Sequence, residues 1–196
     1  MLGLAMLAYH DSHGKLPPAV VYGKDGKALY SWRVLVLPYI EEQGLYNEFR
    51  LDEAWDSPHN IRLLERRPHA YAPPSRYAHK IPPTHTYVHV FVGKGTPFEN
   101  PEGHSMASIT DGTSYTFLVI EAGKPVPWTK PEDLSYSADQ PLPDLDGPFR
   151  DIMRVGFADG SHRTIPRDFD ENAFRAAITR NGGEKFNLNS LDCPGK

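Results

Sequence analysis

The sequence predicts an α+β fold with an antiparallel β-sheet and long proline-rich loops. Helical and strand patterns follow one another without the regular alternation of a doubly wound parallel sheet, which argues against a nucleotide-binding α/β fold. The 196 residues include 19 prolines and 16 glycines, an excess over the usual combined share of about 12%. This composition favours an irregular, loop-rich domain over a helical bundle.

The first helix is predicted at residues 1–10, which are apolar almost all round and precede the helix-ending sequence Asp-Ser-His-Gly at 11–14. A short helix that is apolar on every side is expected to be buried. The alternative, which we favour, is that residues 1–12 are the last part of a longer helix whose first part is missing from this chain. The segment is shorter than the about 18 apolar residues that span a bilayer, and it lacks the basic front and cleavage site of a signal peptide.

Capping signals predict three more helices. Ser31 is expected to cap a helix that starts at Trp32 and kinks at Pro38, because proline clashes with the preceding turn. Ser57 with the proline that follows starts another helix, which ends before residue 68. The last helix is capped by Asp170, turns Phe174, Ala177 and Ile178 inward, and is closed by Asn181-Gly182-Gly183.

Four strands are predicted. Residues 84–92 alternate strictly, and we assign the valine face to the core, which leaves Tyr87, His89 and Phe91 on the other face. Residues 115–121 form the second strand, and residues 153–158 and 161–166 flank Asp159-Gly160, the signature of a type I′ hairpin. Asp25-Gly26 marks another turn, and prolines predict loops at 68–83 and 124–148.

The composition also excludes several function classes. The net charge of −4 provides no basic field for nucleic acid or anionic lipid. The single cysteine, Cys193, rules out an internal disulfide and a multi-cysteine zinc site. The length predicts one domain over residues 1–196.

No motif predicts an active site. Ser105 fits the relaxed nucleophile elbow of serine hydrolases, but it lies in a polar loop with no helix after it. The glycines around Lys94 lack the spacing of a phosphate loop. Adjacent Glu41 and Glu42 diverge by about 100° on a helix and cannot form a catalytic pair. We therefore predict a protein that is not an enzyme and carries no cofactor.

Metal and nucleic-acid sites are not predicted either. Histidines pair at 85 and 89 and at 10 and 13, but no third ligand has a diagnostic zinc spacing. The aspartates at 144, 146 and 151 do not follow a calcium-loop pattern and are interpreted as a solvated loop. Three arginines at 62, 66 and 67 are interpreted as a solvated helix face.

Several blocks together resemble a prepilin-like family abundant in planctomycetes, the domain of unknown function 1559, named for a C-terminal motif of His, nine residues, then Asp-Gly. Phe149 stands where that motif has its histidine. The resemblance spans nearly the whole chain. The blocks are Gly-Leu-Ala at 3–5, Tyr-His-Asp-Ser-His-Gly-Lys-Leu-Pro-Pro at 9–18, Ser-Trp-Arg-Val-Leu-Val-Leu-Pro-Tyr at 31–39, Trp-Asp-Ser-Pro-His-Asn at 55–60, Ile-Thr-Asp-Gly-Thr-Ser at 109–114, Val-Pro-Trp-Thr-Lys-Pro at 126–131, Phe-Ala-Asp-Gly-Ser at 157–161 and Thr-Arg-Asn-Gly-Gly at 179–183.

The resemblance implies a pilin-like fold, in which the N-terminal helix packs on the antiparallel sheet. It also implies an extracytoplasmic or cell-surface location, although the chain itself carries no targeting segment, and membrane contact only through an N-terminal helix that this chain lacks. Implied partners are other protein subunits or cell-surface components. The motif residues with an implied structural or interaction role are Trp32, Trp55, Asp56, Pro58, His59, Asn60, Asp111, Gly112, Trp128, Asp159, Gly160, Asn181, Gly182 and Gly183.

Three functional hypotheses follow. The first is a non-enzymatic structural or interaction module, a pseudopilin-like extracytoplasmic domain of a secretion or surface-filament protein. The second is an extracytoplasmic domain that binds a small ligand or carbohydrate through exposed aromatics such as Tyr87, Phe91 and Trp128, with His89 on the same face and the loop at 124–148 as a lid. The third is a hydrolase that uses Ser105 and a histidine.

Overall fold

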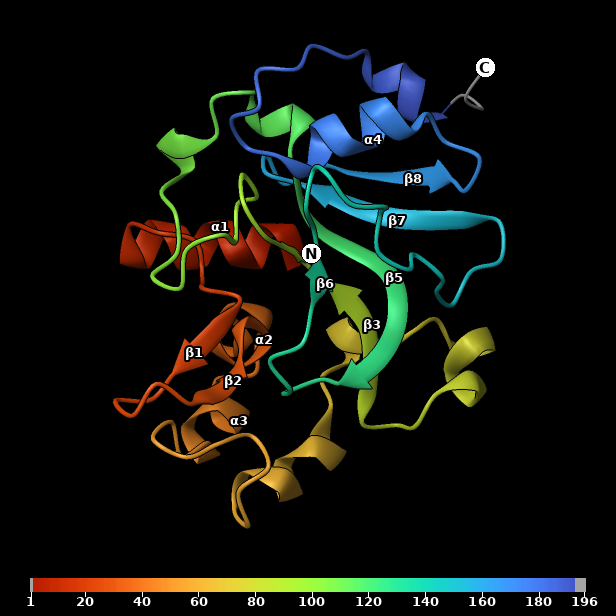
Figure 1. The fold of residues 1–196 in the computed structure, drawn as a ribbon. Helices are drawn as coiled ribbons and strands as arrows, with labels where there is room; N and C mark the ends of the chain where they lie inside the picture. The colour runs from red at the N-terminus through yellow and green to blue at the C-terminus, as the bar shows by residue number, and fades with distance from the viewer. Residues whose placement is uncertain (1, 193–196) are drawn as a thin grey trace.

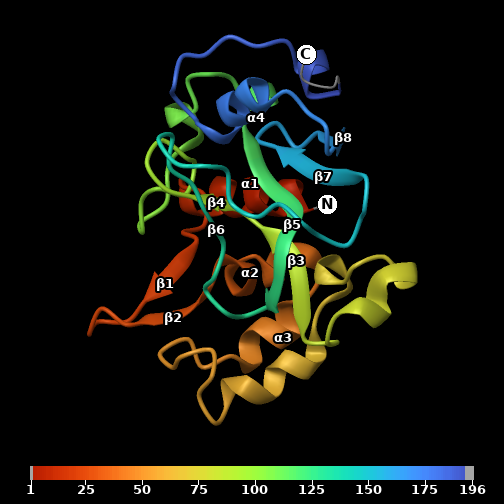
Figure 2. The same ribbon diagram turned by 45° about the vertical axis from the view of Figure 1, so that its right-hand side comes forward.

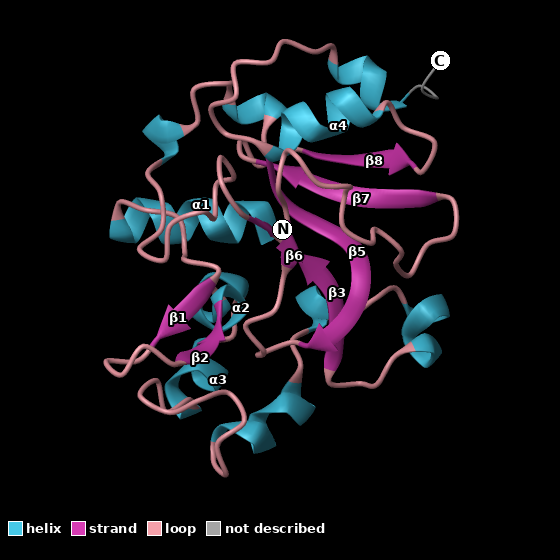
Figure 3. Ribbon diagram, in the orientation of Figure 1, coloured by secondary structure: helices cyan, strands magenta, loops and turns pink. Residues whose placement is uncertain are grey.

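The computed structural model describes residues 2–192, so Cys193 lies outside the described residues. Its centre is a four-stranded antiparallel sheet of order β3–β5–β7–β8 (Figures 1 and 3). The strands are β3 (His85–His89), β5 (Phe117–Pro127), β7 (Ile152–Phe157) and β8 (His162–Pro166). Helices and an antiparallel sheet without regular alternation confirm the α+β prediction.

Two smaller pairings lie beside this sheet. β1 (Val20–Tyr22) and β2 (Ala28–Ser31) form an antiparallel hairpin through the predicted turn, where Gly26 has φ +78°. β4 (Phe91–Val92) and β6 (Leu134–Ser135) pair in parallel. The long helices are α1 (Leu2–His13) and α4 (Glu171–Ile178). Short α-helical and 3₁₀ segments fill the connections: α2 (Trp32–Leu35), η1 (Leu37–Ile40), α3 (Gln43–Glu48), η2 (Asn60–Arg66), η3 (His69–Tyr71), η4 (Ser75–Lys80), η5 (Met106–Ser108), η6 (Thr113–Tyr115) and η7 (Leu188–Asp192).

The sheet separates two hydrophobic cores. On one face, Val119 of β5 belongs to the core that contains Met6 of α1 and Val88 of β3. On the other face, Ile120 of β5 belongs to the core that contains Phe174 of α4. Because neighbouring strand residues point to opposite faces, β5 contributes to both cores. Figures 1 and 2 show α1 beside β5 and α4 beside β8.

The helix signals at Ser31 and Pro38 are confirmed. The Ser31 hydroxyl accepts a hydrogen bond from the backbone N–H of Arg33, which caps α2. The helix then stops and restarts as the 3₁₀ segment η1, with Pro38 near its start. Asp170 likewise caps α4 by accepting from the N–H of Ala173.

Two predicted boundaries are wrong. Ser57 accepts from the N–H of Asn60 and so closes one turn, but the segment after it is the 3₁₀ helix η2. The second strand does not end at residue 121, because β5 continues to Pro127 through a bulge opposite Thr86–Val88. The expected loop at 124–148 therefore begins as sheet and also contains the short strand β6. Pro125 lies within this bulge, where a proline is accommodated inside a strand.

The expected strand at 84–92 divides at Val90. Its N–H donates to the Asp133 carboxylate (3.0 Å), and its carbonyl accepts from the N–H of Leu134 (3.1 Å). Val90 thus leaves the main sheet and turns toward β6. The valine face is buried as predicted, but His89 and Phe91 are also buried, at 2% and 3% exposure.

The hairpin at Asp159-Gly160 is confirmed, but its type I′ assignment is wrong. A type I′ turn needs positive φ at both central residues, and only Gly160 has it, at +84°. The N–H of Phe157 bonds to the carbonyl of Ser161 (2.9 Å), which closes a three-residue loop. A turn followed by glycine in the left-handed region is the usual form of such loops.

The first helix is confirmed, but it is not buried on every side. Ala5 and Met6 are buried against the sheet, whereas Leu4 is 58% exposed. Among the described residues, the helices are too short to cross a membrane.

Removal of the Met6 side chain tests the packing of α1 on the sheet. Met6 is fully buried, so Met6→Ala should lower the free energy of unfolding by about 2–5 kcal/mol in urea denaturation. Leu4→Ala on the exposed face should change it by less than about 1 kcal/mol. Equal losses in the two variants would contradict the observed orientation of the helix.

Candidate functional site

The family blocks at 109–114 and 179–183 meet through Asp111. Its carboxylate accepts hydrogen bonds from the N–H groups of Gly182 (2.7 Å) and Gly183 (3.0 Å), and its own N–H donates to the carbonyl of Arg180 (3.2 Å). Gly183 has φ +79°, a conformation that favours glycine. Asp111 therefore fixes the chain that leaves α4, while Asn181 between these contacts is exposed.

The block at 157–161 joins the same cluster through Asp159. Its N–H donates to the carbonyl of Thr113 (3.1 Å), and its carboxylate accepts from the N–H of Ser161 (2.8 Å). Partial burial opposes ionisation, but hydrogen bonds from Ser161 and Ser114 outweigh it and hold the pKa of Asp159 below its ordinary value. Three blocks far apart in sequence are thus held together by backbone hydrogen bonds.

The block at 55–60 organises the loop before η2. The amide of buried Asn60 accepts from the N–H of Arg50 (3.1 Å) and donates to the carbonyls of Arg50, Glu53 and Ala54 (3.0–3.3 Å). The N–H of Trp55 donates to the carbonyl of Leu29. His59 donates from Nε2 to the carbonyl of Glu48 (2.9 Å), while Asp56 and Pro58 are exposed.

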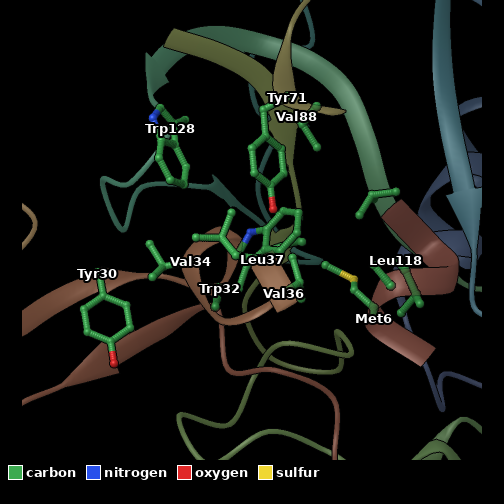
Figure 4. Close-up of a cluster of buried hydrophobic side chains, with 14 of the residues drawn as sticks. Met6, Tyr30, Trp32, Val34, Val36, Leu37, Tyr71, Val88, Leu118 and Trp128 are labelled. Carbon is green, nitrogen blue, oxygen red and sulfur yellow. The ribbon is translucent and has the colours of Figure 1, made fainter. Parts of the chain in front are cut away.

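The tryptophans of the other blocks belong to the core (Figure 4). Trp32 and Trp128 are fully buried, and Trp128 donates from Nε1 to the carbonyl of Leu64 (3.1 Å). Tyr71 stacks on Trp128 with ring centroids 5.7 Å apart and meets Trp32 edge-on at 6.2 Å. These residues have no free ring surface for a ligand.

The expected ligand face is not a surface. Phe91 packs edge-on against Phe174 of α4 (6.1 Å) and Tyr136 (6.4 Å), and His89 is buried, so Tyr87 alone remains half-exposed. The physical reason is that both faces of the sheet are covered, and alternation along one strand cannot reveal a second core.

A buried polar cluster lies where β3, α2 and the loop before β6 meet. Arg33 is fully buried, and its Nη2 donates to Oδ1 of Asp133 (2.6 Å), whose side chain is 2% exposed. Nε of Arg33 donates to the carbonyl of Val88 (2.8 Å), and Nη1 donates to the Ser31 hydroxyl (2.7 Å). A buried guanidinium requires partners of this kind for its donors.

His89 completes this cluster. Its Nε2 donates to the carbonyl of Lys124 (2.9 Å), which leaves Nδ1 to accept from Nη2 of Arg33 (3.4 Å). Oδ1 of Asp133 also accepts from the N–H of Val90, and Oδ2 has no hydrogen-bond partner. No sequence pattern pointed to Asp133, but the arginine inside the apolar run Trp-Arg-Val-Leu-Val is a signal that a buried partner must exist.

The residues considered for catalysis have local structural contacts. The Ser105 hydroxyl caps η5 by accepting from the N–H of Ala107 (3.3 Å). Nε2 of His10 accepts from the N–H of Met106 (3.2 Å), so His10 ties α1 to that loop. Across residues 2–192, the structure contains no cluster of three His, Cys, Asp or Glu side chains suited to a metal. Phe149, where the expected C-terminal motif would have its histidine, is buried with the Arg154 guanidinium 4.6 Å from its ring centroid.

Loss of one partner tests the buried ion pair. Asp133→Ala should lower the free energy of unfolding by about 3–5 kcal/mol, because it leaves the Arg33 charge buried and unpaired. The control is Glu132→Ala, because Glu132 neighbours Asp133 in sequence and forms an exposed ion pair with Lys130. This variant should lower the free energy of unfolding by less than about 1 kcal/mol. Chemical denaturation measures both. A small loss in Asp133→Ala would show that Arg33 does not depend on this carboxylate.

The Asp111 contacts are testable in the same way. Asp111→Ala removes two charge-assisted hydrogen bonds and should cost about 1.5–3 kcal/mol. Amide exchange at Gly182 and Gly183 should become faster. The control is Asp56→Ala, an exposed aspartate of another block. Unchanged exchange at both glycines would contradict the assigned contacts.

Comparison with known proteins identifies a family for this chain. No curated protein and no solved structure matches the chain. Residues 1–97, about half of the chain, match the family described as SBP_bac_10, protein of unknown function (DUF1559). By this match the chain belongs to the DUF1559 family.

Proposed function

We propose that this chain is a non-enzymatic structural or interaction module, a pseudopilin-like extracytoplasmic domain that associates with other protein subunits through the outer face of α1. The observation that carries the proposal is the two-sided character of this helix. One side is anchored in the core through Ala5 and Met6, and the other presents Leu4 with 58% of its surface exposed.

The anchored side is firmly held. α1 contacts η1, β5 and β7, and Met6 belongs to the same core as Trp32 and Trp128. Its last turn is fixed by the hydrogen bond between His10 and the backbone of Met106. A helix held in this way can present apolar side chains without losing its own packing.

The presented side is apolar and lies next to the β7–β8 turn. Leu7 and Ala8 are half-buried, and Leu4 approaches Gly160 so closely that a Cβ there would lie 2.7 Å from Leu4 Cδ2. Glycine at 160 therefore lets the turn pass beside the helix. Leu4 is the exposed apolar residue of this side, and we propose that a partner subunit covers it together with its half-buried neighbours.

The roles of the family blocks also support a structural module. Asp111, Asp159 and Asn60 bind backbone groups, and Trp32 and Trp128 pack in the core. The signature residues of the chain thus build a scaffold, whereas catalytic signatures place reactive groups together in a pocket.

Self-association of the protein tests the proposed interaction surface on α1. The wild-type protein should associate with rising concentration in sedimentation experiments, and Leu4→Glu should weaken this association at least tenfold, because burial of a leucine contributes about 1.5–3 kcal/mol. Tyr22→Glu, at another exposed apolar residue on the β1–β2 hairpin, should leave it unchanged. A wild type that stays monomeric at all concentrations, or equal loss in both variants, would contradict the proposal.

The absence of enzymatic activity is tested at Ser105. Wild-type protein and Ser105→Ala should both fail to hydrolyse generic esters above background. A wild-type activity that disappears in Ser105→Ala would replace the proposed module with a hydrolase.

A further inference from the structure

A small hollow opens on the α1 side of the sheet, beside the N-terminal end of that helix. Its volume is about 220 Å³. Its floor comes from β3, β5 and β7, one wall from Leu2 and Gly3 of α1, and another from Ala70 of η3. Figure 1 shows the start of α1 beside β5. The hollow is smaller than the about 300–1,000 Å³ of pockets for drug-sized ligands.

Two opposite charges stand together in this hollow. Glu121 of β5 and Arg154 of β7 are directly paired across the strands. Oε2 of Glu121 lies 3.7 Å from Nη1 of Arg154, so they form an ion pair without a hydrogen bond, and Oε2 has no hydrogen-bond partner. The Glu121 side chain is 17% exposed, whereas that of Arg154 is 50% exposed.

The position of the Glu121 carboxylate is unfavourable for its ionised form. Burial raises the pKa of Glu121, and the opposing influence of Arg154 is too weak to cancel this effect. A buried acceptor without a hydrogen bond destabilises the fold, because it has lost its hydration and gained no partner. A cationic donor placed in the hollow would remove that cost.

Apart from Ser161 and His162 at the β7–β8 turn, the other side chains that line the hollow are apolar, and a glycine leaves space among them. Val88 and Val119 line it together with Leu2. Gly156 lies on the floor, and a Cβ there would come within 2.8 Å of Val119 Cγ2. A side chain at 156 would therefore displace Val119, and glycine leaves the space beside it free.

We propose that this hollow binds a small aliphatic α-amino acid. Its ammonium group would donate hydrogen bonds to Glu121, its carboxylate would accept from Arg154, and its side chain would lie against Val88 and Val119. A zwitterion carries both charges on one carbon, so it matches two opposite charges that face each other across adjacent strands. A fatty acid would leave Glu121 without a donor, and a simple amine would leave Arg154 without an acceptor.

Calorimetric titration with L-leucine tests the proposal. The wild-type protein should give saturable binding, and Glu121→Gln and Arg154→Gln should each weaken it at least tenfold, which is the loss expected for about 1.4 kcal/mol. Glu65→Gln and Arg62→Gln, exposed residues of η2, are matched controls and should bind like the wild type. 3-Methylbutylamine and 4-methylpentanoate, which carry one charge each, should bind at least tenfold more weakly than leucine.

The proposal fails if the wild type shows no saturable binding up to about 10 mM leucine, if both site variants bind like the controls, or if the amine alone binds as well as leucine. A second readout does not depend on the variants. In the wild-type protein, leucine should shift the amide resonances of Gly3, Ala70 and Gly156, and an absence of shifts there would place any binding elsewhere and overturn the assignment. This test uses other variants and another readout than the self-association test at Leu4, so the two proposals can fail separately.

Discussion

The ion pair between Arg33 and Asp133 is the contact on which the hydrophobic core on the α1 side of the sheet depends. Arg33 has no exposed surface, and it joins α2 to the backbone of β3 and to the loop before β6. A guanidinium in such a place is stable only when its donors are matched, because removal of a charge from water costs several kcal/mol. The same carboxylate accepts from the N–H of Val90 and thereby turns the chain from β3 into β4. One side chain that is far away in sequence thus satisfies a buried charge and ends a strand.

The two faces of the sheet are covered in different ways. The face toward α4 is closed by three phenylalanines, of which Phe117 packs on both Phe157 and Phe174. The face toward α1 is covered less completely. Met6 fills its centre, while the end near Leu2 keeps the hollow with Glu121 and Arg154. Apolar packing explains the side chains on the face toward α4. The face toward α1 also carries the charges of Glu121 and Arg154, which apolar packing does not require.

The residues of the conspicuous sequence blocks could be found from sequence but their roles could not, and no pattern pointed to Asp133. The blocks at 109–114, 157–161 and 179–183 stand out in the chain, yet only the folded structure shows that Asp111 and Asp159 bind backbone groups of the other blocks. The prediction of an exposed aromatic ligand face was wrong for a related reason. Alternation in residues 84–92 locates the buried valines correctly, but it cannot tell that Phe91 meets α4 from the other side.

Local chemistry by itself determined the helix starts at Ser31 and Asp170, the break at Pro38 and the turns at Gly26 and Gly160. These features depend on hydrogen bonds and dihedral limits within a few residues, so they can be read from neighbours in the chain. The sequence also determined the α+β class, through the absence of regular strand–helix alternation. Tertiary structure alone decided which face of α1 is exposed, where the strand at 84–92 divides, and which carboxylate pairs with Arg33. Each of these features depends on burial and on partners from distant segments. The contribution of a charge or an apolar side chain to stability is set only when those partners remove it from water.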